Sequence, residues 1–159
     1  MNKPMRNIKN KPRRLESVFQ CYSNPVYFVT FNTMYRAKIL DNKNVYDLFV
    51  EYALKNLEQG RAVGKFVIMP DHIHLFVRLS DENKLSDFVR LLKHSLTRYL
   101  RGCEKVKEVW QPGFFDHLLR NAESYSEKWD YVRLNPVRYQ LVDKPEDWLW
   151  QGEITDIEF

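Results

Sequence analysis

The chain has 159 residues, a length typical of one domain whose core is stable without disulfides. Hydrophobic residues make up 44% and aromatic residues 14% of it, which excludes a disordered protein. No apolar run approaches the ~18 residues of a membrane span, and the N-terminus lacks a signal peptide's apolar core. Cys21 and Cys103 form no disulfide framework and predict reduced thiols in a cytoplasmic protein. The net charge of +4 favours polyanionic partners.

Residues 1–20 are expected to form a flexible basic arm. Their first part is rich in Lys and Arg without any acidic residue, and Pro4 and Pro12 interrupt any helix. Such an arm could lie along a phosphate backbone or simply remain solvated. A single domain is expected over residues 21–142, and residues 143–159 are expected to form a C-terminal tail.

The elements expected in the domain alternate in a recognisable order. A strand is predicted over residues 27–33, a helix over 44–59 that ends at Gly60, and a hairpin over about 62–79. A second helix is predicted over 87–101, capped by Ser86, and a last strand within 109–119. The order βαββαβ predicts an α+β, ferredoxin-like (RRM-like) sandwich. Its antiparallel sheet has both helices on one face and leaves the other face open.

The hairpin carries a pair of histidines after its Pro70-Asp71 turn. Side chains alternate along a strand, so His72 and His74 share one face while Ile73 lies on the other. Two imidazoles so placed can bind one metal ion. The alternative is a pair of histidines on a half-solvated strand face.

A third helix is predicted downstream, capped by Ser124 and continuing through Asn135 to Pro136. Tyr131 and Asn135 lie four residues apart, hence on one helical face. Placed over the open side of the sheet, the phenol could act as a nucleophile and the amide as a third metal ligand. Taken alone, the tyrosine could also be a rim residue and the asparagine a helix-end residue.

Several motifs together resemble the single-tyrosine HUH transposases, and most closely the REP-associated tyrosine transposase branch. The similarity extends from about Tyr27 to Trp148. The segments that carry it are Met69-Pro70-Asp71-His72-Ile73-His74, Trp110-Gln111-Pro112-Gly113-Phe114-Phe115-Asp116-His117, Arg120-Asn121 and Asp130-Tyr131-Val132-Arg133-Leu134-Asn135-Pro136-Val137.

The resemblance implies an enzyme that cleaves and rejoins single-stranded DNA through a 5′-phosphotyrosine. It assigns the nucleophile to Tyr131 and the binding of Mg²⁺ or Mn²⁺ to His72, His74 and Asn135. It further implies a hairpin of a repeated extragenic palindrome as substrate. The REP-associated branch favours a monomer, whereas insertion-sequence relatives form dimers whose active sites are made in trans. Tyr125 competes as nucleophile by distance but lacks the Asn-Pro context.

One departure from the family pattern follows the predicted third helix, where Tyr139-Gln140 replaces a segment that commonly contains Gly.

Phosphate contacts are expected from basic side chains of the second helix and of the later segments. These are Arg90, Lys93, Arg98, Arg120, Arg133 and Arg138. Phe114, Phe115 and Trp150 could stack on unpaired bases, and His117 is expected to be a core or surface residue. Two other functions remain open: a non-catalytic RRM-like nucleic-acid-binding module, and a metal-dependent phosphodiesterase that uses water as its nucleophile.

Overall fold

A computed structural model describes residues 24–104 and 106–159, so the predicted basic arm and Cys21 lie outside the described residues. Five strands form one sheet: β1 (Val26–Asn32), β2 (Arg61–Ile68), β3 (His72–Leu79), β4 (Phe115–Leu119) and β5 (Gln151–Glu153). The helices are α2 (Lys43–Leu57), α3 (Leu85–Glu104), α4 (Ala122–Val132) and α5 (Asn135–Arg138). Two short 3₁₀ turns lie at Met34–Arg36 and Pro145–Asp147.

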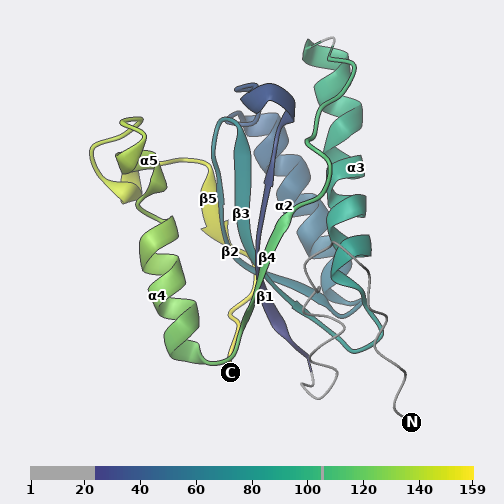
Figure 1. Ribbon diagram of the computed structural model, residues 1–159, viewed down its shortest axis with the longest axis vertical. Helices are drawn as coiled ribbons and strands as arrows, with labels where there is room; N and C mark the ends of the chain where they lie inside the picture. The colour runs from purple at the N-terminus through teal and green to yellow at the C-terminus, as the bar shows by residue number, and fades with distance from the viewer. Residues whose placement is uncertain (1–23, 105) are drawn as a thin grey trace, which may run out of the picture.

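The strand order is β4-β1-β3-β2-β5, and every recorded pairing is antiparallel. Helices α2 and α3 cover one face, while α4 and α5 lie on the other (Figure 1). The predicted ferredoxin-like α+β order is therefore confirmed, and the face expected to be open is the one beneath α4 and α5.

Two hydrophobic clusters correspond to the two faces. The larger joins the sheet to α2 and α3 and contains Phe31, Phe49, Phe66 and Phe88, all nearly inaccessible to water. The smaller cluster lies beneath α4 and includes Phe28, Phe76, Tyr125, Val132 and Trp148. Because both faces of the central strands are buried, alternate residues along β3 are held in fixed positions.

The predicted third helix is interrupted where the sequence analysis expected it to continue. Helix α4 ends at Val132, and Asn135 begins the separate short helix α5. Pro136 is the physical reason: it has no N–H to continue the helical ladder, and it fits the first turn of a new helix. The predicted caps also differ: the Asn121 side chain, not Ser124, caps α4, and α3 begins at Leu85, before Ser86.

Residues 143–159 pack against the domain rather than extending away from it. Strand β5 pairs with β2, and the Trp148 indole donates a hydrogen bond to the backbone oxygen of Ile68 at 3.0 Å. Ile157 is buried in the cluster beneath α4. No helix of residues 24–104 and 106–159 has the length and apolarity needed to cross a bilayer.

Candidate active site

His72 and His74 meet at their Nε2 atoms on the α4 side of the sheet. The two nitrogens lie 3.1 Å apart, and His72 is only 4% exposed. Phe28 from β1 stacks against the His74 ring at 5.5 Å between centroids. The alternation predicted for β3 therefore places both imidazoles where one cation could contact both.

The opposite nitrogen of each ring is held by a neighbouring side chain. His72 Nδ1 lies 2.6 Å from an oxygen of Asp71, whose second oxygen accepts a hydrogen bond from Arg36 at 2.9 Å. His74 Nδ1 lies 2.7 Å from the hydroxyl of Thr30 on β1. With Nδ1 engaged, each ring can present the lone pair of Nε2 to the site.

Burial keeps these rings neutral. Burial is the main cause, and together with the charges of His72, Arg138, Arg36 and Lys128 it lowers the pKa of His74 to about 3. Burial also lowers the pKa of His72, although the Asp71 carboxylate opposes that shift. For Asp71, burial acts to raise the pKa, but hydrogen bonds with His72 and Arg36 outweigh it and the pKa falls. Neutral imidazoles beside an ionised carboxylate are the form that binds metal.

Asn135, the predicted third ligand, lies beside the two imidazoles. Its side-chain nitrogen lies 2.7 Å from His74 Nε2, and its oxygen accepts a hydrogen bond from Arg138. Across the described part of the chain, no three His, Cys, Asp or Glu side chains gather into a metal-binding cluster. The donor set therefore consists of two imidazoles and one amide, which fits a divalent cation once the amide turns its oxygen toward the rings.

Tyr131 lies beside this group on the last turn of α4. Its side chain is 64% exposed, and the Arg138 guanidinium lies 4.0 Å from the centre of its ring. Among the recorded hydrogen bonds of the described residues, none joins the Tyr131 hydroxyl to His72 or His74. The structure therefore brings the histidines and Asn135 together and links Tyr131 to them through Arg138.

The competing tyrosine is placed differently. Tyr125 is buried, its hydroxyl accepts a hydrogen bond from the Lys65 backbone N–H, and burial raises its pKa to about 12. Both effects disfavour it as a nucleophile. A further tyrosine, Tyr139, is exposed, and its ring centre lies 6.0 Å from that of His72. Sequence reasoning assigned it no role.

Three cations lower the pKa of His74 from outside the ligand set: Arg138, Arg36 and Lys128. Lys128 also lies 5.2 Å from the centre of the Phe28 ring. The sequence pointed to Arg138 but not to Arg36 or Lys128. Only the spacing along α4, where Lys128 precedes Tyr131 by one turn, could have indicated the lysine.

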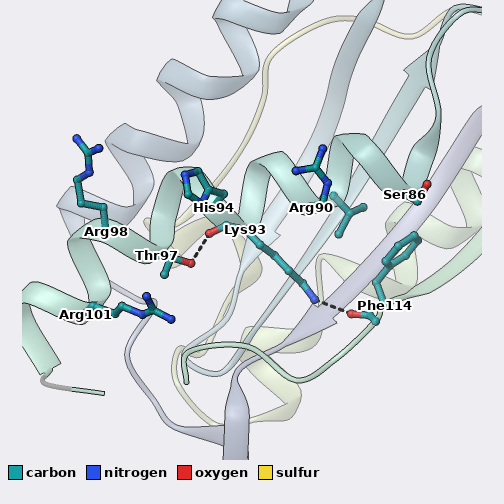
Figure 2. A pocket seen from close by; sticks show the side chains of 10 residues that line it. Ser86, Arg90, Lys93, His94, Thr97, Arg98, Arg101 and Phe114 are labelled. Carbon is teal, nitrogen blue, oxygen red and sulfur yellow. Dashed lines mark hydrogen bonds between the residues drawn. The ribbon is translucent and has the colours of Figure 1, made fainter. Parts of the chain in front are cut away.

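The basic residues of α3 lie on the opposite side of the sheet. They line a groove of about 790 Å³ between α3 and the segment before β4. Figure 2 shows Arg90, His94, Arg98 and Arg101 along the helix, with Phe114 across from it. Lys93 differs from these residues, since its ammonium donates to the backbone oxygens of Gln111 and Gly113 at 3.0 and 2.6 Å. Burial lowers its pKa to about 8.

The other predicted DNA-contacting side chains are spread over the molecule. Arg120 follows β4 and is exposed, and Arg133 lies 3.9 Å from Glu146. Phe115 is exposed on the same side as Phe28, 6.5 Å away between ring centres. His117 lies exposed on β4, as a surface residue.

The turn after α5 accommodates the residues that replace the family's glycine. Gln140 adopts a φ of 57°, the left-handed conformation that glycine favours. The departure in sequence therefore leaves the turn intact and places Tyr139 beside His72.

The known proteins that this chain resembles in sequence are transposases. The family described as "Transposase IS200 like" matches residues 21–133. A REP-associated tyrosine transposase of Escherichia coli is 24% identical over 153 residues, covering 82% of this chain and 91% of that protein. A Haemophilus influenzae relative is 29% identical over 102 residues, covering 57% of this chain and 58% of its own length.

A solved structure shares the fold. It is a REP-associated tyrosine transposase bound to a REP hairpin, with a TM-score of 0.67 and 22% sequence identity. The similarity covers 86% of this chain and 90% of that one.

Proposed function

This chain belongs to the IS200-like transposase family, and on that premise we propose that it cleaves and rejoins single-stranded DNA at hairpin sites. The observation that carries the proposal is the convergence of His72, His74 and Asn135 beside the exposed Tyr131. The hairpin of a repeated extragenic palindrome is proposed as substrate, by similarity to relatives described as REP-associated.

In the proposed reaction Tyr131 is the nucleophile. The Tyr131 hydroxyl gives its proton to water as its oxygen attacks a backbone phosphorus. The bond from phosphorus to the 3′ oxygen breaks, and that oxygen takes a proton from water to become a 3′-hydroxyl. The product is a 5′-phosphotyrosine, which keeps the energy of the broken bond. Attack by a 3′-hydroxyl on the phosphotyrosine then rejoins DNA and returns the proton to Tyr131.

His72, His74 and Asn135 would hold a divalent cation, with Mg²⁺ or Mn²⁺ favoured by the phosphate oxygens of the substrate. Such an ion supplies positive charge against the non-bridging oxygens as negative charge develops there. Asp71 and Thr30 hold the two imidazoles in orientation. Arg36 and Lys128 add positive charge around the phosphate position.

The α3 groove is proposed as a second phosphate-binding surface, through Arg90, Lys93 and Arg98. Arg120, Arg133 and Arg138 would contact DNA on the side of the nucleophile. Since α3 and α4 cover opposite faces of the sheet, DNA that reaches both sites must pass an edge (Figure 1). The edge nearest the α3 groove is strand β4, because the segment just before β4 lines that groove. Phe115 is exposed on this strand.

The proposal is tested by incubating labelled hairpin DNA carrying a single-stranded flank with the protein and Mg²⁺ or Mn²⁺, then running a denaturing gel. A covalent protein–DNA band is expected, and Tyr131→Phe should abolish it. Tyr139→Phe is the matched control, because it removes another exposed phenol, whose ring lies 6.0 Å from that of His72. Cleavage that survives Tyr131→Phe would indicate a phosphodiesterase using water, and binding without cleavage an RRM-like module.

An active site built within one copy of the chain is proposed, because contacts inside that copy join the histidines to Asn135 and, through Arg138, to Tyr131. A monomer is the simplest assembly of that kind. Mixing Tyr131→Phe with His72→Ala provides the test. If each active site is built within one chain, the mixture forms no more covalent product than its components do alone. Recovered product would indicate sites shared between two copies.

A further inference from the structure

One side chain touches both the proposed nucleophile and the proposed third ligand. Arg138 on α5 donates to the backbone oxygen of Tyr131 at 2.6 Å and to the side-chain oxygen of Asn135. Its guanidinium also lies against the Tyr131 ring, 4.0 Å from the centroid. One terminal nitrogen of Arg138 makes both hydrogen bonds while the guanidinium plane lies against the ring, and a lysine ammonium has no such plane to stack.

The contact with Asn135 decides which end of the amide faces the histidines. Because Arg138 binds the oxygen, the amide nitrogen is the end that lies 2.7 Å from His74 Nε2. A cation needs the oxygen instead, since the amide nitrogen has no lone pair to donate. The guanidinium therefore competes with a metal ion for the same oxygen, and its positive charge also repels that ion.

The contact with Tyr131 restrains an otherwise exposed ring. The side chain is 64% exposed, and its recorded ring contact is the one with Arg138. Cation–π stacking of this kind favours the Tyr131 rotamers that keep the ring against the guanidinium. An attacking oxygen that is free to rotate spends less time in line with the phosphorus.

We propose that Arg138 is a positioning residue that couples Tyr131 to Asn135. It holds the phenol in one orientation and keeps the Asn135 oxygen turned from the histidines until a cation and the substrate phosphate compete for these groups. The proposal rests on the proposed function, since it assigns the metal-binding role to Asn135 and the nucleophilic role to Tyr131.

The coupling predicts that Arg138→Ala moves two measurements in opposite directions. Affinity for Mn²⁺, titrated on the DNA-free protein, should rise about 3- to 10-fold because the Asn135 oxygen is released and a positive charge is removed. The single-turnover rate of covalent adduct formation at saturating metal should fall about 10-fold or more. A residue that merely supports the end of α4 would lower both.

Two variants separate charge from stacking. Lys144→Ala removes a positive charge from an exposed residue of the C-terminal segment, so it should leave the Mn²⁺ affinity near that of the unmodified chain. Arg138→Lys keeps the charge but not the planar stack. It should therefore hold the Mn²⁺ affinity low while adduct formation remains slow.

The orientation of Tyr131 is read separately, without DNA cleavage. In protein carrying ¹³C-labelled tyrosine, the resonance missing from Tyr131→Phe identifies Tyr131. In Arg138→Ala this resonance should move toward the position of a free tyrosine. An unmoved resonance, or a Mn²⁺ affinity that is unchanged or lower, would overturn the proposal. The Mn²⁺ titration and the Tyr131 resonance can both be measured without DNA cleavage. If the unmodified chain forms no covalent adduct, the proposed function is therefore overturned, and these two measurements still test the role of Arg138.

Discussion

The side-chain nitrogen of Asn135 lies 2.7 Å from Nε2 of His74, although 61 residues separate the two in the sequence. This contact joins the start of α5 to the middle of the sheet. It places the amide beside both imidazoles, because the two Nε2 atoms are themselves 3.1 Å apart. Three polar side chains, those of His72, His74 and Asn135, therefore lie together on the face of the sheet that α4 and α5 cover, away from the water that such groups ordinarily favour.

Asp71→Asn should weaken metal binding by about 10- to 100-fold, the usual effect of losing a carboxylate that orients a ligating histidine. The carboxylate lies 2.6 Å from His72 Nδ1, and an amide in its place can present the wrong end to the ring. Isothermal titration with Mn²⁺ measures the change. Asp143→Asn, at an exposed position in the C-terminal segment, is the control. If the unmodified chain, Asp71→Asn and Asp143→Asn all bind Mn²⁺ with equal affinity, Asp71 does not orient the His72 ring.

Arg98→Gln should reduce the dependence of hairpin-DNA affinity on salt. A side chain that neutralises one phosphate contributes a slope of about 0.9 in a plot of log affinity against log salt, so the slope should fall by about that amount. Fluorescence anisotropy at several salt concentrations provides the measurement. Lys144→Gln, an exposed cation of the C-terminal segment, is the comparison. If both variants retain the full slope, the α3 groove does not bind phosphate.

Gly64→Ala should destabilise the fold by about 1–3 kcal/mol, the typical cost of overpacking. A Cβ there would lie 2.6 Å from Cδ1 of Ile157 and 2.7 Å from the Tyr125 hydroxyl. The matched control is Gly102→Ala on α3, where a Cβ would meet nothing within 4 Å. That change should stabilise by about 0.5–1 kcal/mol, because alanine is the better helix former. Urea unfolding measures both, and equal effects would contradict the close packing of β2 against the C-terminal segment.

Lys93 should make stability depend on alkaline pH. Burial lowers its pKa to about 8 in the folded protein, whereas an unfolded lysine titrates near about 10.4. Between these values the unfolded chain binds the additional proton, so the free energy of unfolding rises as the pH rises. Because the side chain is half-exposed, water screens part of the effect.

Lys93→Met removes this titration. The difference in free energy of unfolding, Lys93 protein minus variant, is therefore expected to be smallest below pH 8 and to grow toward pH 10. Urea unfolding of both proteins at intervals across this range measures it. If the difference in free energy of unfolding stays constant across this pH range, folding does not lower the pKa of Lys93.

Much of the fold followed from local patterns. Alternation along β3 placed His72 and His74 on one face, and the order of apolar periodicities predicted the ferredoxin-like sheet with α2 and α3 on one side. The resemblance to insertion-sequence-like transposases is confirmed by the family match over residues 21–133, and the resemblance to their REP-associated branch by the Escherichia coli relative. The prediction failed locally at the third helix, because Pro136 ends α4 before Asn135.

What remained depended on contacts between segments far apart in the chain. Sequence periodicity determines which side chains share a face, but only packing determines what lies opposite that face. Tertiary structure therefore decided that Thr30 and Arg36 would hold the histidine site, that Arg138 would bind both Tyr131 and Asn135, and that Tyr125 would be buried. It also placed the basic face of α3 across the sheet from Tyr131, a relation that no spacing within α3 could specify.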